Sequence, residues 1–171
     1  GGAVSILSAD QGSADGYVLL TPYWRFGGAL SHAFWPILRL FFGRWTPLKN
    51  ADFSDERVRT GLLRVIPDLD IDDWAVQEEL RQFVVPTALL NELRRLGTST
   101  ARAARRLMAP TLVFQGLRDT MVRPEHTASL VARLPRLSSY EIVDGSHNLP
   151  SPDDGAWERI ERTTLAFANG L

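Results

Sequence analysis

Two polar side chains near the carboxyl-terminal end of the sequence could together transfer protons. Asp119 lies shortly after the apolar run 111–114 (Thr-Leu-Val-Phe), and His147 follows the run 140–143 (Tyr-Glu-Ile-Val) after an Asp-Gly-Ser turn. Such short runs are typical of strands buried in a parallel sheet. Because neighbouring parallel strands end at the same edge of a sheet, we expect Asp119 and His147 to lie close together there. The acid and the base of a Ser-His-Asp triad are positioned in this way.

Asp119 and His147 could each also have an ordinary structural role. Their matching positions after neighbouring strands favour the catalytic role. Asp119 taken alone would be a turn residue, because aspartate is common after strands. His147 would otherwise be an exposed loop residue, yet imidazole changes charge near neutral pH and therefore suits proton shuttling. Asp144 is an alternative acid, but the glycine after it indicates that it begins a turn. We expect His126 on the exposed side of a helix, and His32 as a core or pocket-rim residue.

No serine in the sequence has the surroundings of a catalytic nucleophile. Ser5, Ser8 and Ser13 are expected in a helix or loop without a Gly-x-Ser-x-Gly context, and Ser146 is a turn neighbour of His147 that points elsewhere. The chain has no cysteine, which excludes disulfides, thiol catalysis and cysteine-ligated metals. Its three histidines are scattered and lack the spacing of a metal site. The sequence therefore offers no candidate for the nucleophile, the third member of a triad.

The elements that would position this pair alternate between strands and helices. Residues 1–10 indicate a helix, and residues 17–20 indicate a strand that Thr21-Pro22 ends. After Pro110 the pattern reads strand, turn, helix, strand, helix, with Pro124 in the first turn of one helix and Asp153-Asp154 at the start of the other. The apolar stripes of these helices are Thr127, Leu130, Val131, Leu134 and Trp157, Ile160, Thr164, Phe167. This alternation predicts an α/β fold, a parallel sheet with right-handed crossovers.

The block between the first two expected strands has no strand pattern from residue 24 to about residue 108. The expected helices are 30–42, 53–63 with Ser54 as N-cap, 74–83 capped by Asp72-Asp73, and 87–96. Because this block is too long for an ordinary crossover, we expect a cap inserted over the carboxyl edge of the sheet. The expected domains are a core of 1–23 and 109–171, and a helical cap of 24–108.

One cap segment, 30–45, is strongly apolar and includes Trp35, Leu38 and Phe42. These side chains either bury against the core or form an acyl-binding wall or interfacial lid, and both can hold in a cap helix. They are the candidate substrate-binding residues.

Composition narrows the classes of partner. The 171 residues carry a formal net charge of −1. This charge does not favour binding to nucleic acid or to an anionic membrane. The arginines between residues 94 and 106 are expected on a solvated helix face. No apolar run reaches the roughly 20 residues of a membrane helix. We expect a cytoplasmic protein with at most peripheral membrane contact. The first residue is not Met, and the chain is expected to be a piece of a longer protein.

The chain resembles the carboxyl-terminal half of an α/β-hydrolase with a helical cap, in the monoacylglycerol lipase, lysophospholipase and carboxylesterase group. Residues 110–122 match that group's P-x-L-x-x-x-G-x-x-D-x-x-V pattern, which implies Asp119 as the triad acid. Residues 144–147 match its x-G-x-H turn, which implies His147 as the base. The opening Gly-Gly-Ala matches the end of the nucleophile elbow Gly-x-Ser-x-Gly-Gly-Ala. The nucleophilic serine would then lie two residues before Gly1.

The resemblance implies a serine hydrolase of carboxylic esters that works through an acyl-enzyme, without a metal or organic cofactor. Its partners would be a small-molecule ester with an apolar acyl or alcohol group, and the missing amino-terminal half of the same enzyme. Residues 1–171 alone are expected to be inactive. Two alternatives stay open because a fold does not fix a function. One is the chemistry of epoxide hydrolases, dehalogenases or C–C hydrolases, and the other is a non-catalytic binding protein with the same fold.

Overall fold

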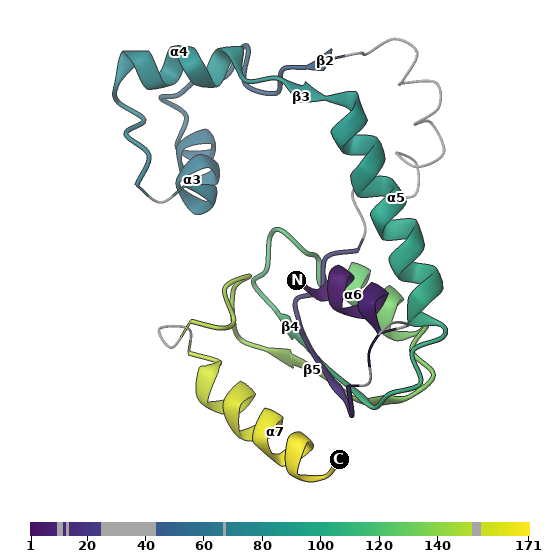
Figure 1. Ribbon diagram of the computed structural model, residues 1–171. Helices are drawn as coiled ribbons and strands as arrows, with labels where there is room; N and C mark the ends of the chain where they lie inside the picture. The colour runs from purple at the N-terminus through teal and green to yellow at the C-terminus, as the bar shows by residue number, and fades with distance from the viewer. Residues whose placement is uncertain (10–11, 13, 25–43, 67, 152–154) are drawn as a thin grey trace. The chain divides into compact units, whose positions relative to one another are not determined.

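The computed structural model describes residues 1–9, 12, 14–24, 44–66, 68–151 and 155–171 (Figure 1). The chain forms two compact units, one of Gly1–Phe26 with Leu93–Leu171 and the other of Gly27–Glu92. The expected helix 30–42, with His32 and the candidate substrate-binding residues Trp35, Leu38 and Phe42, lies outside the described residues. So do Asp153 and Asp154. The expected cap boundaries at 24 and 108 stay a prediction.

The first unit is built on a three-stranded parallel sheet in the order β1-β4-β5. Its strands are β1 Tyr17–Leu20, β4 Thr111–Gly116 and β5 Leu137–Val143. This confirms the predicted neighbours and their parallel direction. Strand β5 begins three residues earlier than the apolar pattern indicates, because the exposed Leu137 pairs with Thr111 through the backbone.

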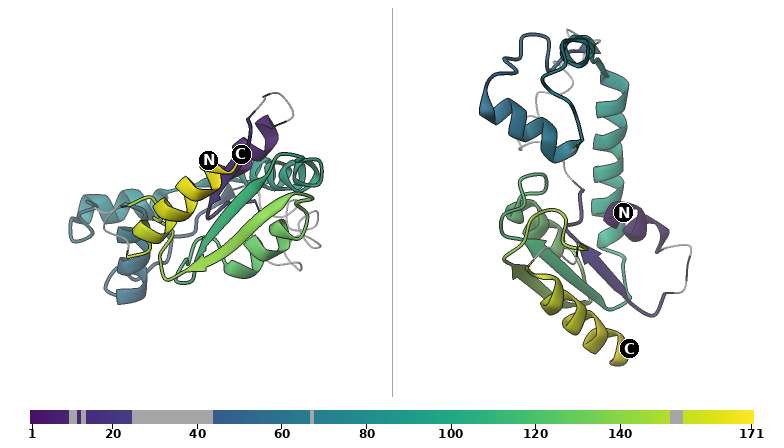
Figure 2. Two further views of the ribbon diagram at one scale, coloured as in Figure 1. Left: turned by 90° about the horizontal axis from the view of Figure 1, so that it is seen from below. Right: turned by 90° about the vertical axis from the view of Figure 1, so that its left-hand side faces the viewer.

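Helices cover both faces of this sheet, as Figure 2 shows for α6 and α7. One face carries α1 Gly2–Ser8, α6 Pro124–Val131 and the end of α5 Thr87–Ala104. Their core cluster comprises Ile6, Leu19, Trp24, Ala103, Ala104, Leu107, Val113, Leu130, Val131 and Leu134. The other face carries α7 Trp157–Asn169, in a cluster of Leu112, Phe114, Val143, Leu149, Ala156 and Ile160. Alternate residues of β4 thus point to opposite faces, as a pleated strand requires.

The second unit contains the helices α3 Glu56–Val65 and α4 Trp74–Gln82. Asp73 caps α4 as predicted, and its side chain accepts a hydrogen bond from the Ala75 N–H at 2.8 Å. The Ser54 cap was wrong: Asp55 caps α3 by accepting from the Arg57 N–H at 2.8 Å. Aspartate is among the preferred N-cap residues at both helices. Helix α3 begins one residue later than the predicted Ser54 cap implies.

Two further expectations for residues 24–108 are corrected. A short antiparallel ladder joins β2 Arg44–Trp45 to β3 Val85–Pro86, where no strand was expected. Such two-residue strands are too short to leave an alternating pattern. Helix α5 also continues past residue 96, through Gly97 and Thr100 to Ala104. Burial in the first unit's core stabilises this extension over the poor helix propensity of its sequence.

Candidate active site

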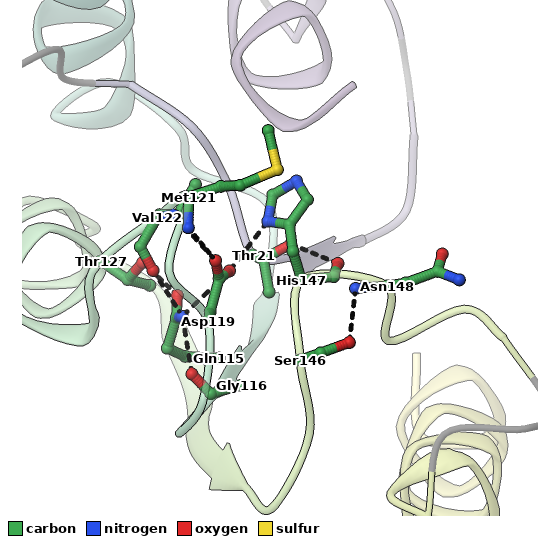
Figure 3. Close-up of polar contacts among 10 residues, drawn as sticks. All are labelled: Thr21, Gln115, Gly116, Asp119, Met121, Val122, Thr127, Ser146, His147 and Asn148. Carbon is green, nitrogen blue, oxygen red and sulfur yellow. Dashed lines mark hydrogen bonds and ion pairs between the residues drawn. The ribbon is translucent and has the colours of Figure 1, made fainter. Parts of the chain in front are cut away.

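The acid sits in the loop that follows β4, where its carboxylate is fully enclosed. The Asp119 side chain has no exposed surface. Its Oδ1 atom accepts hydrogen bonds from the backbone N–H groups of Met121 and Val122, each at 2.8 Å. Its Oδ2 atom lies 2.8 Å from Nδ1 of His147 (Figure 3). The loop closes around the carboxylate and directs one oxygen at the imidazole.

The base lies on the loop that follows β5, the neighbouring strand. With Nδ1 donating to Asp119, His147 has its second ring nitrogen, Nε2, available as a proton acceptor. Nε2 points away from Asp119 in Figure 3, and 38% of the side-chain surface is exposed. The two side chains meet as predicted. Their catalytic roles stay a prediction.

Glycine 116 allows the two loops to approach each other. A Cβ atom at Gly116 would lie 2.3 Å from the carbonyl oxygen of Ser146 and 2.6 Å from that of Gly145. The acid loop is also tied to the base loop by backbone hydrogen bonds, from Leu117 to Val143 at 2.8 Å and from Arg118 to Gly145 at 3.0 Å. The absence of a side chain at position 116 is therefore what brings the His147 loop within reach of Asp119.

The alternative acid, Asp144, is engaged elsewhere. Its Oδ1 atom lies 2.9 Å from Nε of Arg118, and 79% of its side chain is exposed. The same arginine donates from Nη2 to the Asp144 carbonyl at 3.1 Å. This ion pair joins the two loops, while the Asp119 carboxylate contacts the imidazole.

The end of β1 lies at the same edge of the sheet. Thr21 has a φ of 40°, a left-handed conformation that is strained for a β-branched residue. Its N–H donates to the carbonyl of Phe114 at 2.9 Å, and its hydroxyl reaches the carbonyl of His147 at 3.5 Å. A Cβ atom at Gly2 would lie 2.8 Å from Cβ of Pro22, the next residue. The beginning of α1 is thus packed beside the strand end that contacts the His147 loop.

Three of the four serines considered as nucleophiles lie within the described residues and have local partners. Ser5 and Ser8 donate to the carbonyls of Gly1 and Ser5, at 3.4 and 3.0 Å, within and next to α1. The Ser146 hydroxyl accepts from the Asn148 N–H at 3.2 Å. Ser13 lies outside the described residues.

His126 is half-buried, where an exposed position was expected. Trp24 packs beside it and donates from its indole nitrogen to the His126 carbonyl at 2.8 Å. Within the part of the chain that the structure describes, no group of three or more His, Cys, Asp or Glu side chains is arranged to hold a metal ion. No helix of that part is long and apolar enough to cross a membrane.

Sequence reasoning missed two buried polar residues behind the acid, Gln115 on β4 and Thr127 on α6. Thr127 is predicted only as one position of an apolar stripe, and no role is predicted for Gln115. The available signal was a glutamine placed directly between an apolar run and a glycine.

No protein-family model matches the chain, and no curated protein matches it. Solved structures do match. BpoC of Mycobacterium tuberculosis H37Rv, which carries the name of a non-heme bromoperoxidase, is 18% identical with a TM-score of 0.48, over 99% of this chain and 62% of its own. Rv0554 from Mycobacterium tuberculosis is 15% identical with a TM-score of 0.47, over 99% and 61%. A thioesterase domain from the curacin biosynthetic pathway is 16% identical with a TM-score of 0.40, over 86% and 57%.

The chain thus spans about three-fifths of the length of these structures. Identities and TM-scores this low carry no activity over to this chain. Its own features carry the assignment of the fold. The parallel order β1-β4-β5, helices on both faces of the sheet, and an aspartate and a histidine paired where β4 and β5 end fit part of an α/β-hydrolase fold.

Proposed function

We propose that the protein carrying this chain is a serine hydrolase of carboxylic esters, and that this chain supplies the acid and base of its triad. The observation that carries the proposal is the 2.8 Å contact between Nδ1 of His147 and Oδ2 of the enclosed Asp119. A carboxylate held by two backbone N–H groups and an imidazole keeps its orientation. It fixes the tautomer in which Nε2 can accept a proton.

In the proposed reaction, a serine hydroxyl attacks the ester carbonyl while Nε2 of His147 takes the hydroxyl proton. The C–O bond to the alcohol then breaks, the imidazolium returns the proton to the departing alcohol, and an acyl-enzyme remains. Water attacks this acyl group in the same way, giving the carboxylic acid and free serine. Asp119 stabilises the imidazolium in both halves of the reaction without itself becoming protonated.

The proposed nucleophile is a serine two residues before Gly1. Three features support this position. The opening Gly-Gly-Ala matches the end of a nucleophile elbow. Helix α1 begins at Gly2, which packs against Pro22 at the carboxyl end of β1. The adjoining Thr21 contacts the His147 loop. Residues 1–171 alone would then hydrolyse no ester, and the partner they need is the preceding part of the same enzyme.

The proposed substrate is an ester with an apolar acyl or alcohol group. Two exposed apolar side chains flank the acid, Leu117 at 60% and Met121 at 54% exposure. The backbone N–H of Met121 also donates to the Asp119 carboxylate. Trp35, Leu38 and Phe42 remain the proposed apolar wall of the cap. The proposed chemistry uses no metal or organic cofactor, and a cytoplasmic location is proposed with it.

The test compares two histidine variants of the protein that carries this chain, assayed with a short-chain aryl ester. His147→Ala should lower kcat by roughly 10⁴-fold or more, because triad members act as a unit. His126→Ala is the control and should stay within about twofold of the wild type, because the substitution keeps the backbone carbonyl that accepts from Trp24. Loss of activity in His126→Ala with little effect in His147→Ala would mean that the wrong histidine has been assigned. Absence of ester turnover in the wild type would refute the reaction itself.

A further inference from the structure

Behind the Asp119 carboxylate lies a polar pair that has no exposed surface. Gln115, in β4, and Thr127, in α6, are both 0% exposed. The Gln115 amide nitrogen donates to the carbonyls of Gly116 at 3.0 Å and Val122 at 2.9 Å, and lies 3.4 Å from Oδ2 of Asp119. The Thr127 hydroxyl donates to the amide oxygen of Gln115 (Figure 3). The side-chain amide is therefore satisfied at both ends, without water.

This placement is unusual for a glutamine. All six residues of β4 are buried, and the preceding four are apolar or β-branched. A buried amide is tolerated in such a place only when hydrogen bonds replace its lost hydration. Here those bonds go to Gly116 at the end of β4, to Val122 in the loop after it, and to the Asp119 oxygen that contacts His147. The amide thus links the geometry of the loop to the atom that orients the base.

The threonine fixes which way the amide faces. The carbonyls of Gly116 and Val122 can only accept hydrogen bonds, so the amide must present its nitrogen to them. Its oxygen then points to α6, where the Thr127 hydroxyl is the donor that meets it. Without this hydroxyl the buried oxygen would lack a partner, and the amide would gain by turning toward any other donor.

We infer that Gln115 and Thr127 are positioning residues that hold Asp119 for its hydrogen bond to His147. The structural part of this inference stands on the contacts alone, and its effect on rate rests on the proposed function. The test therefore needs one readout that does not depend on turnover. The proton on Nδ1 of His147 provides it, because a firm bond to Asp119 slows its exchange with water and makes it visible by NMR.

The decisive comparison is between Thr127→Val, which removes the hydroxyl at nearly constant shape, and Thr127→Ser, which keeps it. In the protein carrying this chain, Thr127→Val should lose the slowly exchanging Nδ1 proton signal of His147. It should also lower kcat for the aryl ester by about 10- to 100-fold with KM within about twofold, as loss of supporting contacts does elsewhere. Thr127→Ser should restore both. Thr98→Val is the control, because the Thr98 hydroxyl donates within α5, to the Arg94 carbonyl. This variant should change neither readout.

The outcomes separate the two proposals. A Thr127→Val variant that keeps the Nδ1 signal and the wild-type kcat would overturn the inference while leaving the proposed function intact. The proposed function would be refuted, and the inference supported, if the wild type shows the Nδ1 signal but hydrolyses no ester, and Thr127→Val loses that signal. If Thr127→Val fails to fold, hydrogen exchange in the wild-type protein provides the test instead. The two amide protons of Gln115 should exchange far more slowly than those of exposed amides, and rapid exchange would overturn the inference.

Discussion

Adding a single methyl group at Gly116 should separate the base from the acid without touching either side chain. The Cβ atom of Gly116→Ala would lie 2.3 Å from the Ser146 carbonyl oxygen and 2.6 Å from that of Gly145. Both obstructing atoms belong to the backbone of the loop that carries His147. They cannot rotate aside as the end of a long side chain would, so the loop itself must move.

The size of this movement follows from the contact distances. Ordinary van der Waals contact begins near 3.4 Å, so the base loop must retreat by about 1 Å. That would stretch the 2.8 Å contact between Asp119 and His147 beyond the range of a hydrogen bond. A misplacement of about 1 Å at a reacting group can cost on the order of 100-fold in rate. Overpacking of this kind also destabilises a core by about 1–3 kcal/mol.

The assay measures kcat with an aryl ester and the free energy of unfolding in urea, for Gly116→Ala and for a control glycine. Gly61→Ala is the matched control, because a Cβ atom at Gly61 meets nothing within 4 Å. It lies inside helix α3 and should stabilise the protein by about 0.5–1 kcal/mol without affecting kcat. A Gly116→Ala variant with wild-type kcat and wild-type stability would refute the close approach of the two loops.

The remaining predictions concern the two acids of the site and one ion pair of the second unit. Asp119→Asn should lower kcat by roughly 10³- to 10⁴-fold through loss of the correct imidazole tautomer, whereas Asp144→Asn should change the free energy of unfolding by less than about 1 kcal/mol and leave kcat unchanged. The reverse ranking of kcat would show that Asp144 is the acid. The Arg59 guanidinium, 2.8 Å from Asp72, holds the pKa of Asp72 below its ordinary value through a hydrogen bond and its charge. This pair therefore stabilises the fold at neutral pH, and its contribution is lost as pH falls through the lowered pKa. Asp72→Asn should make the free energy of unfolding less dependent on pH in the acid range below the ordinary pKa of aspartate. An unchanged acid dependence would contradict the assignment.

The sequence was sufficient for the features that repeat along the chain. Apolar runs followed by glycine turns located β4 and β5, and the rule that parallel strands end at one edge placed Asp119 beside His147. Thr127, Leu130 and Val131 of the predicted apolar stripe form the buried side of α6, whereas Leu134 is buried after that helix has ended. Each of these predictions depends on a local pattern or on a general rule of sheet topology.

What the sequence could not provide depends on contacts between distant segments. Gly116 looks like any turn glycine, since only the approach of the base loop shows why a side chain is excluded there. Thr127 has the spacing of a packing residue, and its hydroxyl acquires a role only when α6 lies against Gln115. The continuation of α5 past Gly97 likewise depends on burial in the core, which no helix propensity records.

The most direct test of the account is to identify the nucleophile that His147 serves. The protein carrying this chain would be treated with a fluorophosphonate, which reacts covalently with activated serines, and the labelled peptide identified by mass spectrometry. We expect one adduct, on a serine two residues before Gly1, whose formation slows by roughly 10³-fold or more in His147→Ala. Labelling of Ser5, Ser8, Ser13 or Ser146, or labelling at the wild-type rate in His147→Ala, would contradict it.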